Sequence, residues 1–410
     1  MTLTLAGGLI IDCTSADPRE GAVVVQDGRI AAVATPTGNA SGTTVDCAGL
    51  TVLPGLIDAH THLGAVTVTH PLESSPAFVA AHVFRNLELA LEAGFTTIRE
   101  VAGLDGGVAD VLARGLVRGP RLLPSGPLLC TTGGHGDYAS PWEIGHHHHQ
   151  TGYPGISQLS VTVDGPDEVR RAARENFRRG ATQLKLCVTG GVVSLHDKLT
   201  DTQFSLPELT AAVEEASARG TYVAAHAHGV DGIRNAVEAG VRSIEHGTFL
   251  DAPTARLMAQ RGAVLVPTLA IVRVMKQRWR DMGVPEEVLP RLDGVEESMR
   301  EAILIARDAG VLIGSGSDLL GTEQNERGLE IALQAEVLGI LEALRGATAR
   351  NAQVLRLEDE IGTIEVGKRA DLVAVAGDLL ADPTLIADAS NVVLVVQYGV
   401  VVKDAQRRVS

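Results

Sequence analysis

The sequence predicts an α/β fold in which a large (β/α)8 barrel, or TIM barrel, is combined with a small β-sandwich made from both chain ends. Three observations lead to this prediction. Eight short apolar runs alternate with helical patterns in the middle of the chain, both ends consist of short strands and turns, and no glycine-rich phosphate turn follows the first run. A barrel takes roughly 250 residues, and the 410 residues of this chain leave room for a second unit.

The two ends of the chain share the pattern of short strands. Near the start, "GAVVVQDGRIAAVA" places Asp27 and Gly28 between alternating apolar residues, which is a hairpin signal. Near the end, "GTIEVGKRADLVAVAG" and "ASNVVLVVQYGVVVKD" have the same character. We therefore expect residues 1–53 and 359–410 to pair into one discontinuous β-sandwich domain, with the barrel at 54–358.

The middle of the chain alternates strand and helix patterns. Helices are expected at 166–179 and 206–219, and the eight apolar runs are "LPGLIDAHTH", "FTTIREVA", "PRLLPSG", "QLKLCVTG", "TYVAAHAHG", "RSIEHG", "AVLVPTLA" and "VLIGSGSD". A doubly wound sheet is the alternative, but it should carry a glycine-rich turn where this chain has "DAHTHLG". The segment 127–165 shows no periodicity, and loops of this length are usually functional or disordered. It follows the third strand, on the face where barrels carry their active sites.

Composition narrows the class of partner. A formal net charge of −15 argues against nucleic acid and anionic membrane surfaces, so we expect a small-molecule substrate. No run reaches the roughly 18 apolar residues that span a bilayer, and the start lacks a basic segment, so we expect a cytoplasmic protein. We also expect a homo-oligomer. The scattered cysteines indicate neither disulfides nor a thiolate zinc site: Cys13, Cys47, Cys130 and Cys187.

Metal-binding side chains follow several of the expected strands. His60 and His62 are separated by one residue, so they project from the same side of their strand. A barrel brings the carboxyl ends of all its strands to one rim, where imidazole and carboxylate groups are suitable ligands for zinc and related ions. A single histidine at a strand end is usually an ordinary polar residue, but five strands contribute here. The residues at these ends are His60, His62, Lys185, His226, His228, His246 and Asp318.

Lys185 stands in the middle of the apolar run "QLKLCVTGG", where an unpaired ammonium group would be costly to bury. One interpretation is an ion pair with an acid such as Asp318. The other is that carbon dioxide carboxylates the amine, so that the resulting anion bridges two metal ions. The presence of the other ligands favours the second interpretation.

Together these residues resemble the amidohydrolase superfamily of the binuclear-metal type, through nearly the whole chain. "LPGLIDAHTH" at the entry and "GTIEVGKRADLV" at the exit fit as well. The resemblance implies two divalent ions, taken as zinc: His60, His62 and Asp318 for the first, His226 and His246 for the second, and carboxylated Lys185 as a bridge. "LKLCVTGGVVS", "VAAHAHG", "IEHG" and "TTGGHGD" resemble prolidase-like dipeptidases and carboxypeptidases, and relatives that hydrolyse N-acyl amino acids such as ochratoxin-type amides.

The resemblance implies hydrolysis of an amide or peptide bond to a C-terminal amino acid. Two ions that share a bridging hydroxide supply the nucleophile and polarise the carbonyl. Asp318 would carry the proton from the hydroxide to the leaving amine, beyond a role purely as a ligand. By the same resemblance His135, between loop glycines, would bind the carbonyl oxygen or the oxyanion. His228 lies two residues after His226 and so on the same strand face, where it would either contact substrate or support a metal ligand from behind.

Other functions remain open at this point. A mononuclear ring deaminase would lack the lysine and carry an acid beyond the fifth strand, where only Asp231 is available. A lactonase, esterase or phosphotriesterase would use the same two-metal chemistry, and a non-catalytic barrel scaffold would have lost ligands. The sequence does not indicate a role for the run His146 to His149. It also does not identify the group that binds the substrate carboxylate, for which Arg273 and Lys276 are candidates.

Overall fold

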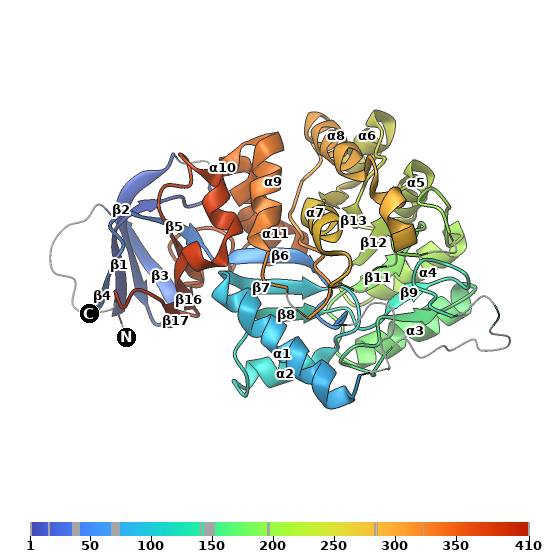
Figure 1. Cartoon of the computed structure of the whole chain (residues 1–410), viewed down its shortest axis with the longest axis horizontal. Helices are drawn as coiled ribbons and strands as arrows, with labels where there is room; N and C mark the ends of the chain where they lie inside the picture. Colours follow the sequence, from blue (N-terminus) through green and yellow to red (C-terminus); the bar gives the residue numbers. More distant parts are fainter. Residues whose placement is uncertain are drawn as a thin grey trace.

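The computed structural model describes residues 2–14, 17–34, 42–66, 74–139, 142, 152–194, 197–282, 284, 286–322 and 324–408. The run 146–149 lies outside these residues. The chain forms a β unit that contains both ends and a barrel surrounded by helices, which lie side by side in Figure 1. This is the predicted fold class.

The β unit combines strands from both ends of the chain. Its hydrogen-bonded order is β17-β16-β15-β5-β1-β2-β3, with β4 paired to β1. The hairpin turn is as expected, because Asp27 and Gly28 both have positive φ, 50° and 78°. The strands are β1 (Thr2–Ile10), β2 (Arg19–Gln26), β3 (Arg29–Ala34), β4 (Thr43–Asp46), β5 (Leu50–Pro54), β15 (Leu372–Ala376), β16 (Val392–Gln397) and β17 (Val400–Asp404).

A single residue separates the β unit from the first barrel strand. Strand β5 pairs antiparallel with β15, and Gly55 then leads into β6 (Leu56–Thr61). A Cβ at Gly55 would lie 2.2 Å from Thr96 Oγ1, so only glycine lets the chain pass so close to the neighbouring strand. We propose that the boundaries between the β-sandwich domain and the barrel domain lie here and before residue 359.

The barrel strands pair in parallel in two sheets. The first has the order β6-β7-β8 and the second β10-β9-β11-β12-β13-β14. All these pairings are parallel, as alternating strands and helices require. The bounds are β7 (Phe95–Glu100), β8 (Arg121–Pro124), β9 (Leu128–Cys130), β10 (Ser160–Thr162), β11 (Leu184–Cys187), β12 (Val223–Ala227), β13 (Ser243–His246) and β14 (Val264–Val266).

The eighth expected strand is irregular. Its segment makes an isolated bridge, Leu265 to Ile313, and Ala59 N donates to Ser315 O on the other side. The Asn351 side chain takes the place of regular ladder partners, since it accepts from Ser315 N (3.0 Å) and donates to Ile57 O (2.7 Å). This segment therefore closes the barrel between β14 and β6 with little regular strand structure.

Helices cover the outside of the barrel (Figure 1). The two that the sequence predicts are present as α3 (Pro166–Arg178) and α4 (Leu206–Ser217), the latter with a capping box of Ser205 and Glu208. The others are α1 (Pro76–Glu92), α2 (Gly106–Ala113), α5 (Val230–Ala239), α6 (Ala252–Arg261), α7 (Leu269–Arg278), α8 (Val295–Asp308), α9 (Gly328–Leu338), α10 (Ile340–Arg345) and α11 (Asn351–Leu355). Short helical turns are η1 (Glu286–Leu292), η2 (Gly346–Arg350), η3 (Pro383–Ala387) and η4 (Ala389–Asn391).

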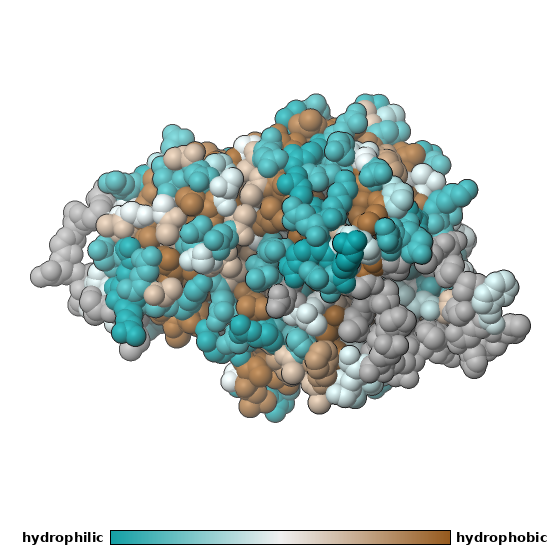
Figure 2. Space-filling model, in the orientation of Figure 1, coloured by the Kyte–Doolittle hydropathy of each residue, from teal (hydrophilic) through white to brown (hydrophobic). Residues whose placement is uncertain are grey.

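The long segment 127–165 is less irregular than its sequence indicates, because β9 and β10 lie near its ends and pair with each other. Three-residue strands are too short to show alternation. Within the described residues, no helix is long and apolar enough to span a membrane. Hydrophilic and hydrophobic residues are interspersed over the coloured part of the face shown in Figure 2. All four cysteines are buried and free, as expected.

Candidate metal centre

The first candidate ligand group lies at the end of β6 and in the loop that follows the eighth strand segment. His60 Nε2 and His62 Nε2 are 3.2 Å apart, and Asp318 Oδ1 lies 3.4 Å from the first and 3.2 Å from the second. The alternation of side chains along β6 brings the two imidazoles together, as the sequence predicts. All three atoms are close enough to bind one ion.

A buried ion pair behind His60 orients this histidine. Glu245 Oε2 lies 2.7 Å from His60 Nδ1, and Arg99 Nη2 donates to both Glu245 oxygens at 2.8 Å. Burial alone would raise the pKa of Glu245, but Arg99 and His60 outweigh it and keep the pKa below its ordinary value. The ionised carboxylate only accepts, so the proton is on Nδ1 and the Nε2 lone pair faces the site.

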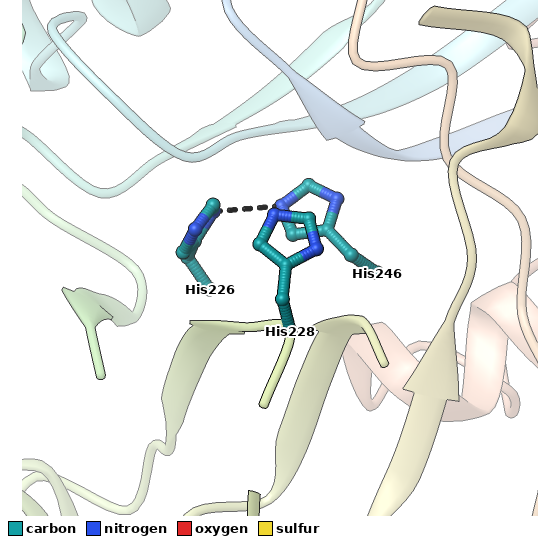
Figure 3. A group of neighbouring side chains, drawn as sticks. All are labelled: His226, His228 and His246. Atoms are coloured by element: carbon teal, nitrogen blue, oxygen red, sulfur yellow. Dashed lines mark hydrogen bonds between the residues drawn. The ribbon is translucent and has the colours of Figure 1, made fainter. Parts of the chain in front are cut away.

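The second candidate group comes from β12, from the turn directly after it and from β13 (Figure 3). His226 Nδ1 lies 2.9 Å from His246 Nε2, and the His228 ring stacks on the ring of His246 with centroids 4.9 Å apart. His226 Nε2 donates to Gly190 O (3.2 Å), which leaves its Nδ1 lone pair free. His246 Nδ1 and His228 Nδ1 face the hydroxyls of Thr268 (2.8 Å) and Thr248 (2.6 Å), respectively.

The two groups are neighbours. His246 Nδ1 is 3.9 Å from Asp318 Oδ2, and the rings of His60 and His246 have centroids 4.9 Å apart. Lys185 belongs to the same cluster, since its Nζ lies 3.5 Å from His60 Nε2. No described carboxylate lies within 4.0 Å of Nζ, so the ion pair between Lys185 and Asp318 that the sequence allows is not formed.

Two candidate ligands have strained backbones. His246 and Asp318 have φ values of 68° and 55°, in the left-handed region that favours glycine. Residues held in this region concentrate at functional sites, because the surrounding structure must compensate for their cost. Gly316 makes the approach of the eighth segment possible, since a Cβ there would lie 2.4 Å from His60 Cβ.

Charge states suit metal binding. Burial lowers the pKa of His62 to about 4 and that of His228 to about 3, and it holds the pKa values of His226 and His246 well below their ordinary value. Metal-ligating imidazoles must be neutral. Burial also lowers the pKa of Lys185. Burial alone would raise the pKa of Asp318, but His60 and His62 outweigh this effect and hold the pKa well below its usual range.

A pocket opens above both groups, with an empty volume of about 970 Å³ that includes the space at its mouth. His135 lines it, with its ring stacked on His226 at a centroid distance of 4.3 Å, and its Nδ1 has no hydrogen-bond partner among the residues that the structure describes. Lys185 and Asp318 also line the pocket. Asp231 does not, because it is exposed on α5 in an ion pair with Arg234 (3.0 Å). All of the predicted site residues that the structure describes lie in this cluster.

The donor set fits two divalent ions. It consists of neutral imidazoles, two of them, His60 and His226, with a tautomer fixed by an acceptor behind the ring, and one carboxylate, which zinc and related ions prefer. The sequence reading missed Arg99 and Glu245. The available signal was opposite charges inside the apolar runs "FTTIREVA" and "RSIEHG", the same signal that singled out Lys185. Fold and site together define a metal-dependent hydrolase of the barrel class.

Comparison with known proteins agrees with this class. The family model described as "Amidohydrolase family" matches residues 51–402. Ochratoxinase from Aspergillus niger is 33% identical over 343 residues, which cover 81% of this chain and 71% of the relative. A crystal structure of a prolidase complexed with N-methylphosphonate-L-proline is 36% identical, with a TM-score of 0.92 over 98% of this chain and 100% of the other. A Xaa-Pro dipeptidase structure with methionine bound in its active site is 30% identical, with a TM-score of 0.88 and the same coverage.

The chain therefore belongs to the amidohydrolase family, and it is a metallo-hydrolase with two candidate metal sites.

Proposed function

We propose that the chain hydrolyses the amide bond between an acyl group and a C-terminal amino acid, as a dipeptidase, carboxypeptidase or N-acyl amino acid hydrolase. The observation that carries this proposal is the convergence of two candidate ligand groups beneath a pocket that His135 also lines, with no partner for its Nδ1 in the described part of the chain. The similarity to ochratoxinase and to prolidase structures over most of the chain supports this substrate class, including ochratoxin-type amides.

In this proposal His60, His62 and Asp318 hold one zinc ion and His226 and His246 hold the other. Two such ions supply a water of lowered pKa and a Lewis acid for the carbonyl. Lys185 would be carboxylated, with a bond between Nζ and carbon dioxide and release of a proton. Its position beside His60, with no carboxylate of the described residues within 4.0 Å of Nζ, supports this role.

The chain's own residues bind the substrate and move the proton. His135 donates a hydrogen bond to the scissile carbonyl oxygen and to the oxyanion that follows. Asp318 Oδ2, which lies 3.9 Å from His246 Nδ1, takes the proton of the attacking water and passes it to the leaving amine. His228 contacts the substrate from the wall beside His246.

The alternatives have less support in the structure. A ring deaminase would need an acid such as Asp231 in the pocket, but this side chain is exposed on α5. A scaffold would not need two converging groups of candidate metal ligands. Lactone hydrolysis requires the same two-metal chemistry, so the experiment that follows must distinguish it from amide hydrolysis.

The test is a screen of dipeptides and N-acyl amino acids that vary the C-terminal residue, with metal content measured on the same preparation. We expect hydrolysis of members of this class and about two metal equivalents per chain after purification with zinc and bicarbonate. Hydrolysis of lactones or ring amines alone would contradict the proposal, and less than one equivalent of metal would favour a scaffold. Size-exclusion chromatography of the same sample tests the predicted homo-oligomer.

A further inference from the structure

A second buried ion pair, besides Arg99 with Glu245, lies close to the first candidate ligand group. Arg327 Nη1 donates to Asp58 Oδ2 at 2.8 Å, and the two side chains are 0% and 1% exposed. Asp58 stands on β6 two residues before His60, and Arg327 directly precedes α9. Burial of two charges is costly, and further hydrogen bonds are needed to compensate for it. The other bonds of this pair therefore show what it holds in place.

Asp58 joins β6 to the segment that carries Asp318. Its Oδ1 accepts from His60 N (3.2 Å) and from Ser317 N (3.0 Å), and its Oδ2 accepts from Ser317 Oγ (2.6 Å). Asp318 N in turn donates to His60 O at 2.9 Å. One carboxylate therefore holds the backbone of one candidate ligand and the residue directly before another.

Asp318 needs such support because its backbone is strained, with a φ of 55°. A residue keeps this conformation only where the surrounding structure fixes it. The preceding residue, Ser317, is held at its backbone N by Asp58, and its Oγ donates to Asp58 and accepts from Arg327 Nη1 (3.0 Å). The ion pair thus fixes the chain just before the strained ligand.

Gln324 extends these contacts to the third ligand of the first group. Arg327 Nη2 donates to Gln324 Oε1 (2.9 Å), and Gln324 Nε2 donates to His62 O (3.0 Å) and to Gly321 O (3.2 Å). Because a guanidinium group can only donate, Arg327 determines which end of the buried amide is the acceptor and leaves Nε2 for His62. Arg327 therefore reaches the backbone at all three ligands, through Asp58 or through Gln324.

The Arg327 network consists of Asp58, Ser317, Gln324 and Arg327. Among the described residues, the side chains of this network make no hydrogen bond to β12 or β13. The second group has other neighbours, since His226 Nε2 donates to Gly190 O and His246 Nδ1 faces Thr268 Oγ1. A change in the network should therefore loosen the first group and leave the second in place.

We infer that Arg327 is a positioning residue for the first metal ion. Through the Arg327 network it holds the backbone of the first ligand group, and it thereby sets the affinity of this group, and not of the second, for a divalent ion. This inference rests on the metal assignment in the proposed function and deepens it, because it makes the two metal sites separable. The pair of Arg99 and Glu245 has a different task, since it orients the imidazole of His60.

The experiment measures zinc affinity on the full chain in two backgrounds, each with one ligand group intact. His226→Ala keeps the first group and His62→Ala keeps the second. Competition with a chelator of known affinity gives the dissociation constant of zinc in each background, with and without Arg327→Met. In His226→Ala, Arg327→Met should raise this constant about 10- to 100-fold, the range for residues that support metal ligands. In His62→Ala it should leave the constant unchanged.

Further variants separate positioning from stability of the fold. Arg327→Met leaves Asp58 buried and unpaired, which destabilises the chain, whereas Gln324→Met leaves no buried carboxylate unpaired and should still weaken the first group alone. Arg327→Lys keeps the charge beside Asp58 but lacks the planar fork that also reaches Gln324, so it should restore part of the zinc affinity. Arg345→Met removes an ion-paired arginine outside the site and should match its background.

The inference is overturned if Arg327→Met and Gln324→Met leave the zinc affinity of the first group unchanged, or if they weaken both groups equally. In the chain with both groups intact, Arg327→Met should lower kcat at limiting zinc and regain it as zinc is raised. A kcat that stays low at saturating zinc would contradict a role through the metal.

The same measurements distinguish this inference from the proposed function. Zinc affinity that depends on Arg327, without hydrolysis of any amide in the screen, would contradict the proposed function and leave the inference standing. Amide hydrolysis together with a first group that does not respond to Arg327 would do the reverse.

Discussion

Asp318 combines a position among the candidate ligands with a role in proton transfer. Its Oδ1 faces His60 and His62, and its Oδ2 faces His246 at 3.9 Å. An asparagine would keep an oxygen for the metal but would not accept the proton of the attacking water. The two roles can therefore be separated by one substitution.

We expect Asp318→Asn to lose at least about 100-fold in kcat, the lower end of what a general base contributes, and to keep much of its metal. The measurements are kcat and metal content on the same sample. Asp308→Asn, at an exposed position on α8, is the matched control. Near-normal turnover in Asp318→Asn would show that Asp318 acts as a ligand only.

At the scale of single residues, the sequence predicted the candidate ligands because strand alternation and strand ends determine where they point. His60 with His62, and His226 with His228, lie on common faces for this reason. Arg99 and Glu245 escaped prediction because each lies inside an apolar run, and the ion pair between them joins residues 146 positions apart in the sequence.

At the scale of elements, the eighth barrel segment depends on one side chain from α11. Asn351 accepts from Ser315 N and donates to Ser315 O (2.8 Å) and Ile57 O, so it joins the last segment to β6. No pattern in "VLIGSGSD" shows that a residue some 36 positions later supplies these bonds. The sequence therefore predicted the strand's place but not its irregularity.

We expect Asn351→Ala to lower the free energy of unfolding by about 3 kcal/mol, because it removes three buried hydrogen bonds of about 1 kcal/mol each. Urea unfolding measures the change, with exposed Asn325→Ala as the control. A loss of less than about 1 kcal/mol would mean that the segment closes the barrel without this side chain.

At the scale of the whole molecule, the candidate ligands join distant parts of the chain. His60 and Asp318 come from the first and last barrel segments, and His226 and His246 from the strands between them. Bound ions would therefore hold the barrel closed as well as serve catalysis. Binding to the folded state alone stabilises it in proportion to the logarithm of the free ion concentration.

We expect the removal of metal by a chelator to lower the free energy of unfolding. The loss should be about 2.7 kcal/mol for each ion if the free ion concentration before removal was 100 times the dissociation constant. Thermal unfolding before and after zinc is restored measures this change. His60→Ala should show a smaller effect than the wild type. An unchanged melting temperature after verified metal loss would contradict a structural role for the ions.

The sheet that unites the two chain ends has a practical consequence. In Figure 1 the N- and C-termini lie near each other on the β unit, and Arg408 Nη1 donates to Asp46 O within it. The elements that line the pocket, such as α7 and α8, lie in the other part of the molecule. Fusion partners or surface tethers attached at either end should leave substrate access free, and a short linker should allow circular permutation, with new ends opened in an exposed barrel loop.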